Sequence, residues 1–74
     1  MAVHDLPVTV PADEKSEHDR DLGMRLRSIR KSKGRSMREV AAASQVSESF
    51  LSQVERGIAS PSVASLRRIC SALG

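Results

Sequence analysis

The sequence has few aromatic residues, histidines and cysteines. Phe50 is its only aromatic residue, which argues against the stacking platforms that bind single-stranded nucleic acid. Cys70 is the only cysteine, and His4 and His18 are the only histidines, so an internal disulfide is excluded and a zinc site is not expected. The chain also lacks a signal-peptide pattern and any apolar run near the roughly 20 residues that cross a bilayer. We therefore expect a soluble, cytoplasmic protein with no membrane partner.

A catalytic constellation is also missing. The chain has twelve serines, but it has no histidine in the part expected to fold, no second cysteine, no clustered carboxylates and no glycine-rich phosphate loop. Its 74 residues make one small domain with no room for a large cleft. We therefore expect no enzyme, no cofactor, no metal and no bound small molecule.

Charge is divided unevenly along the chain. Residues 1–21 carry six acidic and two basic side chains, a net charge of −4, whereas residues 22–74 carry ten basic and three acidic ones, a net charge of +7. A basic domain favours a polyanionic partner, most often nucleic acid. The acidic start contains Pro7 and Pro11 and shows no sustained period. It predicts a flexible arm at residues 1–18 before a folded domain at residues 19–74.

Apolar spacing and capping signals predict four helices and no strand, which is an all-α fold. The first helix is expected to begin between Ser16 and Asp21 and to end near Lys33. Residues 36–39 form a capping box, because a serine is followed three positions later by a glutamate. The second helix is therefore expected to begin at Met37 and to last about two turns.

The third and fourth helices follow from two further serine caps. Ser47 is expected to cap a helix over residues 48–56 that ends at Gly57, and Ser62 to cap a helix over residues 63–73. The buried stripe of the last helix is expected to comprise Val63, Leu66, Ile69, Cys70 and Leu73. Cys70 is accordingly interpreted as a small core residue.

The second and third expected helices are short and lie about three residues apart. Small Ala41 and the apolar residues around it would pack these two helices together, which indicates a helix-turn-helix. The residues that carry a family resemblance are Arg30, Ser36, Glu39, Ala41, Val46-Ser47, Glu55-Arg56-Gly57 and Pro61-Ser62. In these the chain resembles the lambda-repressor-like (XRE) family from Leu22 to Gly74. Residues 50–57, followed by residues 60–62, are similar to bacterial regulators with a C-terminal cupin-type sensor. The family normally adds a fifth helix, so the chain is expected to be an N-terminal fragment without that helix or the sensor.

Three positions depart from the family pattern. Gln45 stands where the family usually has glycine in the interhelical turn, at a cost of about 1 kcal/mol if the turn keeps a left-handed residue. Ser44 replaces a frequent apolar residue, and Arg35 stands where many relatives have leucine.

The resemblance assigns base reading to the start and outer face of the third helix. The matching positions are Glu48, Ser49, Ser52 and Gln53. Glutamine can pair with adenine in a bidentate manner, serine with several bases, and glutamate with cytosine. Glu48 is equally well explained as an acid favoured by the helix dipole, and the other three as an ordinary solvated face.

Phosphate contacts are expected near helix starts and cations. The candidates are Met37 through its backbone amide, Arg38, Arg56, Ser60 and Ser62. By the same resemblance, Arg30 and Glu55 form a structural ion pair. The other basic residues of the first helix and the turn after it are interpreted as a solvated basic face.

These observations predict sequence-specific double-stranded DNA binding by a bacterial transcription regulator, as a homodimer on a palindromic operator. One alternative is an antitoxin that binds its own promoter and also covers a toxin. The other is a protein-interaction or coactivator module that does not read bases.

Overall fold

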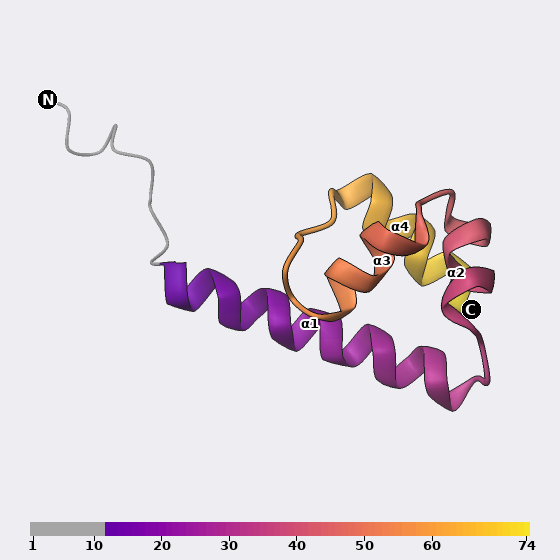
Figure 1. The fold of residues 1–74 in the computed structure, drawn as a ribbon, viewed down its shortest axis with the longest axis horizontal. Coiled ribbons are helices and arrows are strands. Elements are labelled where there is room, and N and C mark those ends of the chain that lie inside the picture. Colours follow the sequence, from indigo (N-terminus) through magenta and orange to yellow (C-terminus); the bar gives the residue numbers. More distant parts are fainter. Residues whose placement is uncertain (1–11) are drawn as a thin grey trace, which may run out of the picture.

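The computed structural model describes residues 12–74, with side chains from residue 17 onward. It contains α1 (Ala12–Ser32), α2 (Met37–Ser44), α3 (Glu48–Glu55) and α4 (Val63–Leu73), and residues 12–74 contain no strand (Figure 1). The predicted all-α class is therefore confirmed. Residues 1–11, which make up most of the expected arm, lie outside the described residues.

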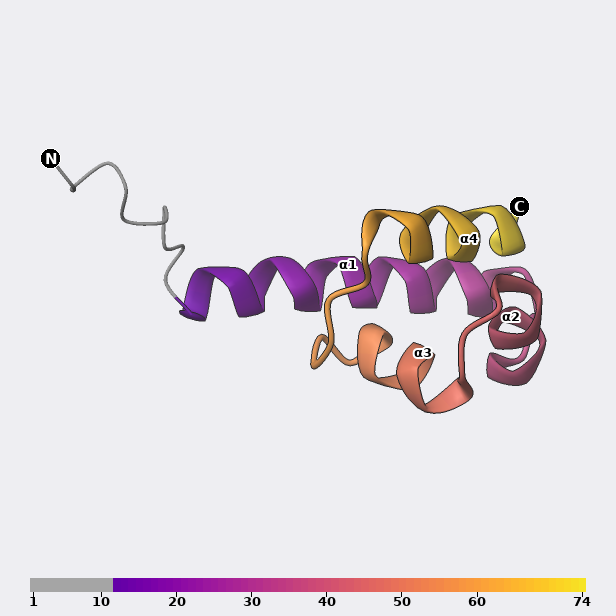
Figure 2. The same ribbon diagram turned by 90° about the horizontal axis from the view of Figure 1, so that it is seen from above.

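The first helix starts earlier than the sequence analysis predicted. α1 begins at Ala12, whereas the expected start lay between Ser16 and Asp21, so residues 12–18 are helical. The reason is that Ala12, Glu14 and Lys15 are good helix formers, and that acids such as Asp13 and Glu14 favour a helix N-terminus. The first turns of α1 extend beyond the other three helices, while its remainder runs beside α3 and α4 (Figure 2).

The predicted caps of α2 and α3 are confirmed. The Ser36 Oγ accepts a hydrogen bond from the Glu39 amide at 3.0 Å, and the Glu39 carboxylate accepts one from the Ser36 amide at 2.8 Å. The Ser47 Oγ accepts from the Phe50 amide at 2.9 Å. Serine therefore satisfies an amide at each helix start that would otherwise have no acceptor in the helix.

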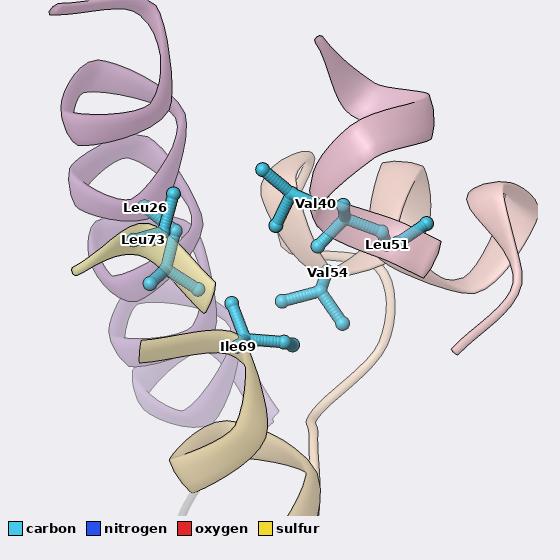
Figure 3. Close-up of a cluster of buried hydrophobic side chains, with 7 residues drawn as sticks. Leu26, Val40, Leu51, Val54, Ile69 and Leu73 are labelled. Atoms are coloured by element: carbon cyan, nitrogen blue, oxygen red, sulfur yellow. The ribbon is translucent and has the colours of Figure 1, made fainter. Parts of the chain in front are cut away.

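One aliphatic core joins all four helices. α1 packs mainly against α3, and α2 packs against α3 and α4. Figure 3 shows the large core side chains converging between the helices. The buried apolar residues are Leu26, Val40, Ala41, Leu51, Val54, Ile69 and Leu73.

The predicted stripe of α4 was partly wrong. Ile69 and Leu73 are buried and Leu66 is half-buried, but Val63 is 71% exposed and Cys70 is exposed. Successive residues turn by about 100° around a helix, so five apolar residues cover a wider arc than α1 and α2 can bury. Cys70 is thus a surface thiol rather than a core residue.

The crossing of α1 and α3 depends on a glycine that the sequence analysis did not single out. Gly23 is buried, and a β-carbon there would lie 2.5 Å from the carbonyl oxygen of Glu55. The two backbones therefore approach more closely than a side chain allows. A glycine inside an otherwise amphipathic helix was the available signal.

Candidate nucleic-acid interface

The third helix separates its buried and outward residues cleanly. Leu51, Val54 and Glu55 are buried. The four base-reading candidates share the other side of the helix: Glu48 and Ser49 are exposed, and Ser52 and Gln53 are half-buried. Polar side chains on one outward helix face can donate to and accept from base edges in a major groove.

The C-terminal end of α3 is joined to α1 by an ion pair. The Arg30 Nε donates to the Glu55 Oε2 at 2.7 Å, and the Nη2 donates to the Oε1 at 3.0 Å. The two side chains are only 10% and 3% exposed. The hydrogen bond to Glu55 raises the pKa of Arg30 above its ordinary value, despite the opposing effect of burial. This bidentate geometry holds the orientation of both side chains.

The same guanidinium reaches a third segment. The Arg30 Nη1 donates to the backbone carbonyl of Arg35 at 3.0 Å. Arg35 lies in the turn between α1 and α2, so one side chain connects α1, this turn and α3. Arg35 itself is exposed, like Arg27, Lys31 and Lys33, which agrees with their interpretation as a solvated basic face.

The start of α2 presents backbone donors and a cation. Met37 is half-buried and Arg38 is exposed. The capping box engages the amides of Ser36 and Glu39, whereas the amides of Met37 and Arg38 occupy helix positions that have no acceptor within the helix. The Ser36 amide donates to the Glu39 carboxylate and lowers the pKa of that carboxyl below its ordinary value. This arrangement is suited to an anion.

The other phosphate candidates lie after α3. Arg56 is exposed, but both serine hydroxyls have partners. The Ser60 Oγ donates to the Asp19 Oδ2 of α1 at 2.6 Å, and the Ser62 Oγ donates to the Ser65 Oγ at 2.9 Å. Either hydroxyl must exchange its acceptor in order to donate to a phosphate.

The turn between α2 and α3 keeps the left-handed conformation. Gln45 has φ 60° and ψ 38°, so the strain expected from a non-glycine residue is present. Ser44 is fully buried, and its hydroxyl donates to the Val40 carbonyl at 2.6 Å. This bond satisfies the hydroxyl inside its own helix, so serine can occupy a position where relatives frequently have an apolar residue.

Two negative findings concern the described residues alone. Among the side chains described, those of residues 17–74, no group of three or more from histidine, cysteine, aspartate and glutamate could hold a metal ion. None of the helices in that part of the chain has the length and apolar character needed to cross a membrane.

A short helix, a three-residue turn and a second short helix with a polar outward face define a helix-turn-helix domain. The chain belongs to the helix-turn-helix domain family, whose model matches residues 21–74. This membership supports the resemblance to the lambda-repressor-like (XRE) family.

Two curated relatives are transcriptional regulators by name. The chain is 48% identical over 48 residues to the transcriptional regulator ClgR of Mycobacterium tuberculosis, covering 65% of this chain and 43% of that protein. It is 38% identical over 50 residues to the regulator DdrOP3 of Deinococcus deserti, covering 68% of this chain and 39% of that protein. The match thus spans about two fifths of each relative's length.

A solved structure has the same fold. The crystal structure of the restriction-modification controller protein C.AhdI from Aeromonas hydrophila matches with a TM-score of 0.75 and 32% sequence identity. The match covers 77% of this chain and 86% of that chain.

Proposed function

We propose that this chain binds double-stranded DNA sequence-specifically as the DNA-binding domain of a bacterial transcription regulator. The observation that carries the proposal is the outward polar face of α3, formed by Glu48, Ser49, Ser52 and Gln53, on a helix whose opposite side is buried. The net charge of +7 over residues 22–74 supports a polyanionic partner. The relatives named as transcriptional regulators support the same conclusion.

In the proposed complex, α3 lies in the major groove and the helix starts around it contact the backbone. Gln53 pairs with adenine, Ser49 and Ser52 contact neighbouring bases, and Glu48 accepts from cytosine. The phosphate contacts come from the Met37 amide, Arg38, Arg56, Ser60 and Ser62. Ser60 gives up its bond to Asp19 when it donates to a phosphate.

The finer parts of the proposal rest on the family resemblance. The domain acts in the bacterial cytoplasm as a homodimer on a palindromic operator, so that two copies of α3 meet two half-sites about one helical turn apart. It acts beside an effector-binding domain of the cupin type, and it performs no catalysis itself.

Selection from a randomised duplex library on the purified chain tests the proposal. We expect an enriched inverted repeat, whose half-site spacing reports the dimer. Gln53→Ala should change the preference at one base pair, whereas Arg56→Ala should weaken binding to all duplexes similarly. Each variant serves as the control for the other.

Three results would count against parts of this proposal. Equal losses on selected and scrambled duplexes for Gln53→Ala would remove that residue from base reading. Salt-sensitive retention without enrichment would reduce the function to phosphate binding. No retention at all would favour the protein-interaction alternative.

A further inference from the structure

The joint between α2 and α3, residues 45–47, determines where the reading helix points, and it contains a strained residue. Gln45 is the only non-glycine residue with positive φ in the described part of the chain, and such a residue is strained relative to glycine there. Only two residues separate Gln45 from Glu48, where α3 begins. A small rotation at Gln45 would therefore shift every candidate base contact.

A side chain from α4 contacts this joint. The Arg68 Nε donates to the backbone carbonyl of Ser44, the last residue of α2, at 2.9 Å. This carbonyl belongs to the last turn of α2, where no further helical amide follows to donate a hydrogen bond to it. Within the joint, the Val46 amide donates back to α2, to the Ala41 carbonyl at 3.0 Å. Arg68 thus adds a bond from outside the helix-turn-helix to the start of its turn.

The same guanidinium lies close to the N-terminal cap of α4. Its Nη2 is 3.5 Å from the Ser65 Oγ, and that oxygen accepts from the Ser62 Oγ at 2.9 Å. Ser62 is one of the proposed phosphate contacts. Arg68 therefore lies between the strained joint before α3 and the part of α4 that is proposed to contact the DNA backbone.

We propose that Arg68 is a positioning residue for base discrimination: its Nε donor holds the α2–α3 turn so that α3 meets the bases in a single orientation. This inference rests on the proposed DNA-binding function. Base contacts demand placement within about 0.5 Å, whereas phosphate contacts carry no sequence information directly. Loss of the donor should therefore reduce the preference for the selected sequence more than it reduces binding to DNA in general.

Two variants separate the donor from the charge. Arg68→Met removes both, while Arg68→Gln removes the charge but keeps an N–H donor at the same number of bonds from the backbone. Arg67 is exposed and adjacent, so Arg67→Met is the matched control for the loss of one positive charge on α4.

The measurement is the ratio of dissociation constants for a scrambled and a selected duplex, at one salt concentration and below the melting temperature of every variant. We expect Arg68→Met to lower this ratio about tenfold, as one mismatched base pair would, and Arg68→Gln to keep it within about twofold of wild type. Arg67→Met should weaken binding to both duplexes by the same factor, because it removes charge alone.

Equal ratios for Arg68→Met and Arg68→Gln, whether both retained or both lost, would overturn the inference while leaving the proposed function intact. A wild-type chain without any sequence preference would overturn the proposed function and this inference with it. If Arg68→Met does not stay folded, the same comparison is made in a Gln45→Gly background, where the turn is relieved of strain and the two variants still differ in the same donor.

Discussion

The two ends of α3 are held in different ways. At the C-terminal end, Glu55 is buried in a bidentate pair with Arg30, and Gly23 of α1 lies against the backbone. At the N-terminal end, Glu48 and Ser49 are exposed and follow a turn that contains the left-handed Gln45.

The difference shows how a small domain can present a helix face to a partner. The Arg30–Glu55 pair and the contact with Gly23 are buried, so they take up none of the outward polar face of α3. The N-terminal end of α3 depends on the capping Ser47 and on the geometry of the turn that contains Gln45. The attachments therefore use the buried side of this eight-residue helix, and the polar side chains proposed to read bases lie on its other side.

The largest effect is expected at the C-terminal end. Glu55→Ala should reduce the free energy of unfolding by about 3–5 kcal/mol, because the buried Arg30 cation loses its partner. Chemical denaturation measures the loss, and the double variant Arg30→Met/Glu55→Leu should recover most of it. An unchanged melting temperature for Glu55→Ala would show that the ion pair with Arg30 does not stabilise the C-terminal end of α3.

The helix crossing is the next most sensitive point. Gly23→Ala should cost about 1–3 kcal/mol, because the added methyl group meets the backbone of α3 and forces the helices apart. Ser28→Ala, on the exposed side of the same helix, should stay within about 0.5 kcal/mol of wild type. Similar stabilities for the two variants in thermal melts would contradict the close approach.

At the N-terminal end of α3, the expected change in the free energy of unfolding has the opposite sign. Gln45→Gly should raise the free energy of unfolding by about 1 kcal/mol, because glycine adopts the left-handed conformation without steric cost. Gln45→Ala keeps the strain and should melt near wild type. A lower melting temperature for Gln45→Gly would mean that the Gln45 side chain stabilises the turn.

The smallest expected effect is the loss of stability at low pH that comes from Glu39, in the first turn of α2. The pKa of Glu39 is lowered from its ordinary value of 4.5 by the Ser36 amide, so its contribution to stability is present above that value and is lost as the pH falls through the lowered pKa. Glu39→Gln preserves the capping pattern without titrating. Urea denaturation between about pH 7 and about pH 3 should show a smaller acid loss for Glu39→Gln than for wild type; equal losses would exclude Glu39 as the titrating group.

Local signals predicted most of the fold. The starts of α2, α3 and α4 were found at Met37, Glu48 and Val63 because the hydrogen bonds of a serine cap lie within four residues of one another. The start of α1 was placed too late because the acidic beginning was interpreted as an arm, although its composition favours a helix.

Long-range geometry was harder to predict. The predicted burial of Val63 and Cys70 was wrong. Apolar spacing shows which arc of a helix is apolar, but it does not show how much of that arc a neighbouring helix covers. The close approach of Gly23 to α3 and the hydrogen bond from Arg68 to the end of α2 join segments far apart in the sequence, so no short stretch of sequence predicts them. The candidate base contacts came from family resemblance and chemistry, and they remain predictions.

The shortness of α2 and α3, eight residues each, has a consequence for cooperativity. Helices shorter than roughly 12–15 residues are marginal in water by themselves, so these two owe their helical state to packing against α1 and α4. A synthetic peptide of residues 36–57 should therefore be largely unstructured. The surface proposed to read DNA exists only while the whole domain is folded, and it should disappear in the same all-or-none transition.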